Sequence, residues 1–328
     1  MAEDLEPLIW KVYEKGDKDD VWPKKNYGAA LVHLLEENKY FLIGGNHDAY
    51  SNEKNYYALN NDLIAAIEEG QNAYQKAENN KLNYIGENLS ENYYAKNQID
   101  LYIYDMEPEP HWYKMTSSGA VPRARSGHQC IHIAPYIFLF GGVELGPKGE
   151  NLSNDELFVL NTRTFVWKKV ITNNSPYNRT DFKWVKIDKL AYLYGGCSSP
   201  NEKFYDDLWM FKYQDQDLFN MEGNTSVNNI WRKIEQSGQT PGKTKAYAME
   251  YHHGFLYLFG GVDPSGVANN TMFKFDLDAG IWEIVDAKGY PPCPRSYHNM
   301  AKINTDTLVV FGGIIGTLRE IKELLNDV

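Results

Sequence analysis

A pair of glycines closes a short aromatic and aliphatic run at five places in this chain. Each run has the length of a strand and is rich in residues that favour strands. Glycine admits a positive φ and lets a neighbouring backbone approach closely, so each pair marks a tight contact at the end of a strand. Recurrence at this scale indicates a repeat architecture. The pairs are Gly44-Gly45, Gly141-Gly142, Gly195-Gly196, Gly260-Gly261 and Gly312-Gly313.

A tryptophan that begins another short strand pattern recurs equally often, and a proline follows each one within 13 residues. Four of these tryptophans lie 28 to 30 residues before the next glycine pair, whereas the distance from a pair to its own tryptophan varies from 21 to 67 residues. The part of the unit from the tryptophan to the next glycine pair therefore has a nearly fixed length, and the part from a glycine pair to its own tryptophan accepts insertions. The tryptophans are Trp10, Trp112, Trp167, Trp231 and Trp282. We expect them to pack between neighbouring units.

Two more strand patterns complete each unit. One lies between the glycine pair and the tryptophan, as in Asp155–Leu160, and the other precedes the pair, as in Gln129–Ile133. Each repeat unit is therefore expected to contain four strands and about 50 residues.

These residues resemble the kelch repeat family. The likeness lies in the glycine pairs, the downstream tryptophan, and the Pro-Arg motifs that precede His128 and His298. The resemblance implies an all-β fold, a kelch-type β-propeller of four-stranded antiparallel blades. Blade 3 departs from the motif because Arg179 has no following histidine, and blade 4 has Lys243 and Lys245 in place of arginine.

We expect one propeller over residues 1–328, with four complete blades and a partial one, truncated from a ring of six or seven. The tryptophan at position 10 belongs to a fourth strand that closes the last blade. In the alternative, 317–325 forms a natural terminal helix, because its leucines and Ile321 have helical spacing. The predicted ranges are 8–14 for the closing strand, 27–115 for blade 1 with an insertion at 46–98, 126–171 for blade 2, 179–235 for blade 3, 244–286 for blade 4 and 296–328 for partial blade 5.

Two insertions interrupt the repeat. The segment 46–98 is rich in Asn, Glu and Tyr, which suggests a mobile surface segment, and Asp62 in it is a candidate helix cap. The segment 214–229 is expected to be a disordered loop.

The 2–3 loop of each blade and the connection from its fourth strand to the next blade, called here the 4–1 connection, leave from the same face. Each 4–1 connection carries a basic residue near its proline, including Lys24 and Lys25 before blade 1. We predict that this rim binds a partner protein through an acidic or phosphorylated peptide. In the alternative, the cations pair with carboxylates of the propeller and orient its loops. The predicted binding residues are Arg123, Arg125, Arg179, Lys243, Lys245, Arg295, Tyr177 and Tyr297.

Composition narrows the function further. The formal net charge of −11 disfavours nucleic acid, and no apolar run is long enough to span a membrane. The acidic start has no signal-peptide pattern, so a cytoplasmic location is expected. Three cysteines have no metal-ligand spacing, and His128 and His298 recur at equivalent repeat positions, which favours a structural role over metal binding.

The sequence therefore predicts a non-catalytic interaction module, a scaffold or adaptor, with no catalytic residues, metal or cofactor. Two alternatives stay open. One is a regulatory kelch domain of a larger enzyme, for example one that precedes a phosphatase domain. The other is a metal-dependent enzyme of the same fold.

Overall fold

The computed structural model describes residues 29–45, 98–108, 110–146, 150–213, 225–227, 230–317 and 320–325. Trp10, Lys24, Lys25 and the helix expected from Asp62 lie outside the described residues. Within them, strands make up nearly all regular structure, and the helical element is the three-residue 3-10 turn η1 (Leu35–Glu37). No helix in these ranges is long and apolar enough to cross a bilayer.

Four antiparallel four-stranded blades follow one another along the chain, as the sequence predicted. Their strands pair in chain order, and a fifth, two-stranded sheet of β22 (Asn299–Lys302) and β23 (Leu308–Phe311) comes after them. Blade 1 contains β1 (Ala30–Leu34), β2 (Lys39–Ile43), β3 (Leu101–Asp105) and β4 (His111–Lys114); blade 2 contains β6 (Gln129–Ile133), β7 (Tyr136–Phe140), β10 (Leu157–Asn161) and β11 (Val166–Thr172); blade 3 contains β12 (Lys183–Ile187), β13 (Leu190–Tyr194), β14 (Leu208–Lys212) and β16 (Trp231–Ile234); blade 4 contains β18 (Ala248–His252), β19 (Phe255–Phe259), β20 (Met272–Asp276) and β21 (Ile281–Ile284).

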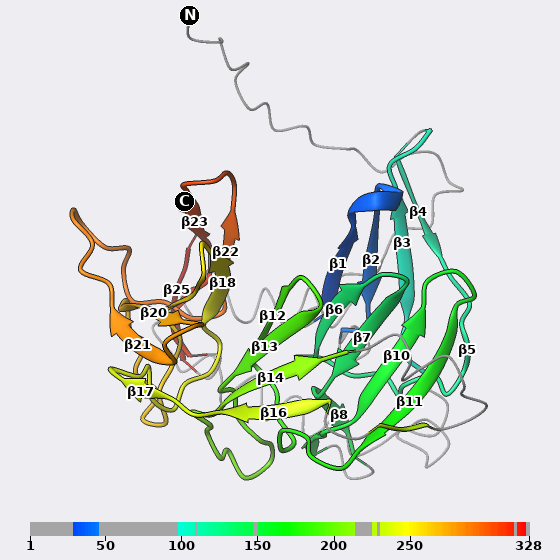
Figure 1. Ribbon diagram of the computed structural model, residues 1–328, viewed down its shortest axis with the longest axis horizontal. Helices are drawn as coiled ribbons and strands as arrows, with labels where there is room; N and C mark the ends of the chain where they lie inside the picture. Colours follow the sequence, from blue (N-terminus) through cyan, green and yellow to red (C-terminus); the bar gives the residue numbers. More distant parts are fainter. Residues whose placement is uncertain are drawn as a thin grey trace, which may run out of the picture.

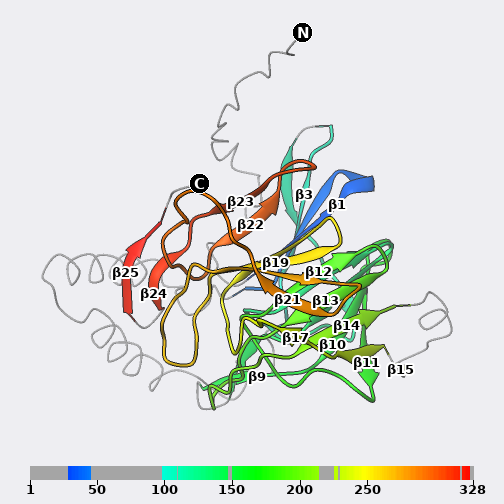
Figure 2. The ribbon, with the colours of Figure 1, turned by 60° about the vertical axis from the view of Figure 1, so that its left-hand side comes forward.

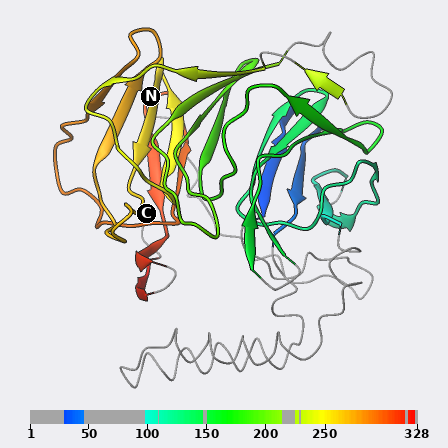
Figure 3. The same ribbon diagram turned by 90° about the horizontal axis from the view of Figure 1, so that it is seen from below.

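The blades are arranged around a common centre, with the first strand of each innermost (Figure 1). These inner strands contact one another in sequence: β1 with β6, β6 with β12, β12 with β18, and β18 with β22. Seen from below, the colours pass from blue through green to orange across the molecule (Figure 3). Radial stacking of this kind buries both faces of small sheets that would be marginal alone.

Tryptophans of the fourth strands fill the spaces between blades. Trp167, Trp231 and Trp282 are at most 2% exposed. The ring of Trp231 lies 5.0 Å from that of Phe140 in blade 2, and the ring of Trp282 lies 5.3 Å from that of Tyr194 in blade 3. Each therefore packs against the preceding blade, where large aromatic burial contributes strongly to stability.

Trp112 differs from its three counterparts. It is half-buried, and its ring contacts Tyr104 of its own blade at 5.0 Å. No described blade lies before blade 1, so the described residues supply no interface of the kind that covers the other three tryptophans.

Two short outer strands link blades in a way that the sequence analysis missed. β5 (Ser118–Gly119) and β17 (Ser237–Gly238) pair in parallel with the fourth strands of blades 2 and 4. Residues just before them accept the indole N–H groups: Ser117 Oγ lies 3.1 Å from Nε1 of Trp167, and Gln236 Oε1 lies 2.7 Å from Nε1 of Trp282. The 4–1 connections thus satisfy the indole N–H groups of Trp167 and Trp282, whereas the buried Nε1 of Trp231 has no hydrogen-bond partner among the described residues.

The expectation of a disordered loop at 214–229 is wrong for part of that segment. Residues Thr225–Val227 form β15, which pairs in parallel with the end of β11. The insertion from blade 3 therefore adds an outer strand to blade 2.

The alternative of a terminal helix at 317–325 is also wrong. β24 (Ile314–Thr317) and β25 (Glu320–Leu324) form an antiparallel hairpin, which stands apart from the sheet of β22 and β23 (Figure 2). It corresponds to the hairpin of β8 (Val143–Leu145) and β9 (Asn151–Ser153) in the 2–3 loop of blade 2.

Candidate functional site

The second glycine of each pair joins its blade to the next. Its N–H donates to a carbonyl in the following 4–1 connection at 2.9 Å in all four described cases. At Gly142, φ is +90° and an added Cβ would lie 2.8 Å from the Cβ of His128, so only glycine fits there. The acceptor residues, which occupy equivalent positions in blades 2 to 5, are Arg125, Arg179, Thr244 and Arg295.

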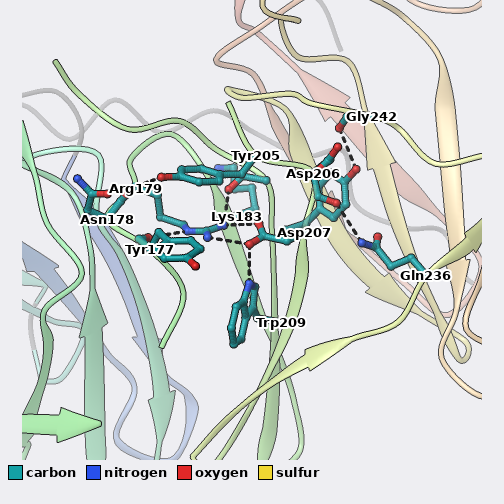
Figure 4. A network of polar contacts seen from close by, with 12 residues as sticks. Tyr177, Asn178, Arg179, Lys183, Tyr205, Asp206, Asp207, Trp209, Gln236 and Gly242 are labelled. Carbon is teal, nitrogen blue, oxygen red and sulfur yellow. Dashed lines mark hydrogen bonds and ion pairs between the residues drawn. The ribbon is translucent and has the colours of Figure 1, made fainter. Parts of the chain in front are cut away.

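Arg179 organises a polar network on the loop face of blade 3 (Figure 4). Its side chain is buried, and Nη1 and Nη2 donate to the two carboxylate oxygens of Asp207 at 2.8 and 3.1 Å. The indole N–H of Trp209 donates to the same carboxylate at 2.7 Å. Burial alone would raise the pKa of Asp207, but the hydrogen bonds and charge of Arg179 hold that pKa below its usual value. Such a bidentate pair fixes the 4–1 connection to the end of the 2–3 loop.

Blade 2 has an equivalent arginine. Nη2 of Arg125 donates to Glu156 Oε2 and Nη1 donates to Asn154 Oδ1, both at 2.7 Å. Nη1 of Arg125, Arg179 and Arg295 also reaches the carbonyl of the first glycine in the pair of the same blade, at 3.3, 2.9 and 3.1 Å. We call this arrangement of a buried arginine between the 4–1 connection and its glycine pair an arginine clamp.

The three clamp arginines do not form an open rim. Arg125, Arg179 and Arg295 are 2%, 0% and 1% exposed. Direct contact with a partner therefore does not fit these side chains, and their geometry supports the alternative in which the cations hold the loops. The sequence could not distinguish partner binding from loop holding, because an arginine at this repeat position can be either buried or exposed.

The clamp holds one residue that varies from blade to blade. Nε of the arginine donates to the carbonyl two positions earlier, at 3.2, 2.9 and 3.2 Å in blades 2, 3 and 5. We call this held residue the display position. In blade 4, where no arginine is present, the hydroxyl of Tyr194 donates to the equivalent carbonyl at 2.9 Å. The display positions are Arg123, Tyr177, Gly242 and Cys293.

The two longest displayed side chains face solvent. Tyr177 is 63% exposed, and the side chain of Arg123 is 69% exposed with Nη1 at 3.4 Å from Glu144 Oε1. Lys243, beside the display position of blade 4, is also exposed. Lys245 is half-buried, with Nζ at 5.1 Å from the ring centroid of Phe204.

Comparisons with known proteins agree with this repeated geometry. A family profile described as the KLHDC2/KLHL20/DRC7 Kelch-repeats domain matches residues 76–313. The chain belongs to the kelch-repeat family. Its fold is also that of the solved structure of YjhT, with a TM-score of 0.58 and 13% identity over 89% of this chain and 74% of that one.

Kelch relatives are similar over part of their length. Human Kelch domain-containing protein 3 is 26% identical over 222 residues, which cover 65% of this chain and 53% of that protein. The flagellar outer arm dynein alpha chain of Chlamydomonas reinhardtii is 25% identical over 232 residues, which cover 66% of this chain and 5% of that protein. The chain thus spans about half the length of its human relative.

His128 of the kelch motif links blade 2 to blade 1. Nε2 of His128 lies 3.1 Å from the carbonyl oxygen of Ile43 in blade 1, and burial, with the nearby charge of Arg125, lowers its pKa to about 3. In blade 4 the same repeat position holds Tyr247, whose hydroxyl donates to the carbonyl of Tyr194 in blade 3. Among the ranges that the structure describes, no three His, Cys, Asp or Glu side chains are grouped to hold a metal ion.

Tyr297 lies at the inner end of the 4–1 connection, away from the display positions. It is half-buried, and its hydroxyl lies 3.3 Å from Asp181 Oδ2 in blade 3, so it spans blade 4. Burial raises the pKa of Asp181, although the charge of Lys245 acts in the opposite direction. The structure therefore brings Tyr297 and Lys245 to one acidic group.

Lys203, Tyr205 and Asp207 were not predicted as site residues. All three lie in the 2–3 loop of blade 3 or at its end, which the kelch motif does not include. The signal that would have indicated Asp207 is the acidic residue directly before a third strand, as also at Asp100; it does not indicate Lys203 or Tyr205.

Proposed function

We propose that this kelch domain is a non-catalytic protein-interaction module that binds a partner protein on the face formed by its 2–3 loops and 4–1 connections. Kelch-repeat domains are typically interaction modules. We further propose that the partner contributes an acidic or phosphorylated segment.

The display positions carry this proposal. Each is held at an equivalent place by a hydrogen bond from a side chain to its carbonyl, yet the four residues differ in size and polarity. A scaffold that keeps its frame and varies the displayed group is suited to specific recognition, because holding a contact residue in place lowers the entropy lost on binding.

The charge of the exposed residues favours an acidic partner segment. Arg123, Lys203 and Lys243 are exposed on this face, although Glu144 partly neutralises Arg123. Carboxylates and phosphates are the groups that such cations recognise.

A peptide library displayed against the immobilised full chain tests the proposal. We expect the selected peptides to be enriched in acidic residues, and Arg123→Glu and Lys243→Glu to weaken them about tenfold or more. Arg163→Glu is the matched control, because Arg163 is an exposed arginine in the turn between β10 and β11 on the opposite face. If the control weakens binding and the face variants leave it unchanged, the proposed face is wrong.

A second candidate function is regulation of a larger enzyme to which the domain belongs. The match to 5% of the flagellar outer arm dynein alpha chain is the observation that favours it, because it shows a similar segment within a much longer chain. A full-length sequence of the natural transcript would test this, and an uninterrupted kelch ring without a further domain would contradict it.

A further inference from the structure

Tyr177 is an exposed aromatic side chain that the fold holds in place. Its carbonyl accepts from Nε of Arg179 at 2.9 Å, and its ring stacks on that of Tyr205 with centroids 6.3 Å apart and planes within 14°. The hydroxyl of Tyr205 in turn donates to the carbonyl of Asn178 at 3.3 Å. Tyr177 nevertheless stays 63% exposed.

The stack continues inward to a neutralised cation. The guanidinium carbon of Arg179 lies 4.3 Å from the centroid of Tyr205, on the network drawn in Figure 4, and Asp207 balances its charge. The inner side of the stack is therefore closed, and the remaining surface for contact is the outer face of Tyr177.

A second cation lies beside the exposed ring. Nζ of Lys203 is 5.4 Å from the ring centroids of both Tyr177 and Tyr205. Lys203 is exposed and forms no ion pair with any residue that the structure describes. Its charge is thus available to an incoming anion within reach of the aromatic surface.

We propose that Tyr177 and Lys203 form a recognition platform for a peptide segment in which an aromatic side chain lies next to a carboxylate or phosphate. The partner's ring stacks on the outer face of Tyr177, and its anionic group contacts the ammonium of Lys203. Ordered exposed aromatics are the residues that dominate interface energies, since little conformational entropy is lost when they are covered. The ammonium of Lys203 repels a guanidinium placed on the ring of Tyr177, so the platform favours an acidic segment over a basic one.

This inference rests on the proposed function and names the partner chemistry at one place on the same face. No other described display position combines these features: Arg123 carries no ring, Gly242 has no side chain, and Cys293 is small and half-buried. Tyr290 is fully exposed on the same face, but no ring or cation contact to it is present in the described part of the chain.

Short peptides blocked at both ends test the platform with the full chain. The first probe is an Asp-Phe-Asp peptide. Two incomplete probes are an Asp-Leu-Asp peptide, which lacks the ring, and an Asn-Phe-Asn peptide, which lacks the charge. The last probe is a phosphotyrosine peptide, which distinguishes recognition of a phosphate from recognition of a carboxylate. We expect the full chain to bind the first or the last probe about tenfold more tightly than either incomplete probe, with affinity falling as salt rises.

Variants assign that binding to named residues. Tyr177→Ala is expected to weaken the acidic aromatic probe about tenfold, and Tyr290→Ala, the matched control, to leave it unchanged. Lys203→Glu is expected to weaken the acidic probe and to strengthen a Lys-Phe-Lys probe, a reversal that a folding defect does not produce.

Three outcomes overturn the inference. The first is equal affinity for complete and incomplete probes, or no binding of any acidic aromatic probe. The second is wild-type affinity in Tyr177→Ala and Lys203→Glu while Arg123→Glu abolishes binding. That result rejects the platform but still supports the proposed binding face. The third is wild-type affinity in all three variants, which rejects both the platform and the proposed face.

Discussion

Blades 3 and 4 are neighbours with the same strand order, yet they hold their 4–1 connections differently. Blade 3 uses the buried pair of Arg179 and Asp207, whereas blade 4 has Thr244 and Thr271 at the two equivalent positions. Both keep the glycine N–H bond to the following blade at 2.9 Å. Blade 4 thus forms without an arginine clamp, and we infer that the clamp has a separate role in blade 3, which is to hold the loop that presents Tyr177.

The comparison is tested most strongly by removing the cation of blade 3. Arg179→Ala leaves Asp207 buried without its partner, so we expect a loss of about 3–5 kcal/mol in the free energy of unfolding. Thr244→Ala removes one neutral hydrogen bond and is expected to cost about 1 kcal/mol. Denaturant unfolding followed by tryptophan fluorescence measures both, and equal losses would remove the distinction between the two blades.

Giving blade 3 the residues of blade 4 sharpens the same comparison. The double variant Arg179→Thr and Asp207→Thr leaves no uncompensated charge, so we expect it to cost about 1–2 kcal/mol, less than Arg179→Ala alone. A double variant as unstable as the sum of its single variants would show that the two side chains act independently.

The histidines of blades 2 and 5 differ from Phe182 and Tyr247 at the same position in blades 3 and 4. Burial, with nearby cations, lowers the pKa of His128 to about 3 and that of His298 to about 4, below the unfolded value of 6.5. The unfolded chain therefore binds more protons between these values, and stability that is complete above pH 6.5 falls as pH is lowered, by at most about 1.4 kcal/mol per pH unit for each histidine.

Replacing His128 and His298 with phenylalanine tests this difference. We expect the double variant to have a flatter dependence of unfolding free energy on pH between 6.5 and 4. A slope identical to that of the natural chain would contradict the buried, neutral state of both rings.

The smallest expected effect concerns the bond that joins blade 4 to blade 3. Tyr247→Phe gives blade 4 the aromatic ring type of blade 3 and removes the hydroxyl that bonds the carbonyl of Tyr194, so we expect a loss of about 1 kcal/mol. Tyr177→Phe, which removes an exposed hydroxyl, is expected to change stability by less than about 0.5 kcal/mol. Equal losses in thermal or chemical unfolding would show that the inter-blade bond contributes nothing.

Much of the fold could be predicted from the sequence because glycine pairs and tryptophans are local signals with fixed spacing. Gly142 needs positive φ and close backbone approach, and Trp167 needs a neighbouring blade, so both are visible as repeated residue types. β15 could not be predicted, because its three residues pair with a strand of another blade that is distant in sequence.

The site was harder to predict for a physical reason. A repeat motif reports which residues recur, and the recurring arginines are those that the frame itself uses. In our proposal, recognition depends on positions that vary beside them. Tyr177 was among the predicted binding residues, whereas Lys203 lies in the 2–3 loop, outside the repeat motif, and was not. The sequence offered Arg125, Arg179 and Arg295 as binding residues, with pairing to propeller carboxylates as the alternative. It could not decide between these, because Glu156 and Asp207, the partners of Arg125 and Arg179, lie about 30 residues further along the chain.

Amide hydrogen exchange at position 179, whose N–H donates to the carbonyl of Asn154 at 3.3 Å, tests the central claim most directly. We expect the double variant Arg179→Thr and Asp207→Thr to exchange this amide much faster than the natural chain, while protection of β12, β13 and β14 stays unchanged. Unchanged exchange in the loop, or equal loss of protection throughout the three strands, would contradict the claim that the arginine clamp orders the displayed loop and does not build the blade.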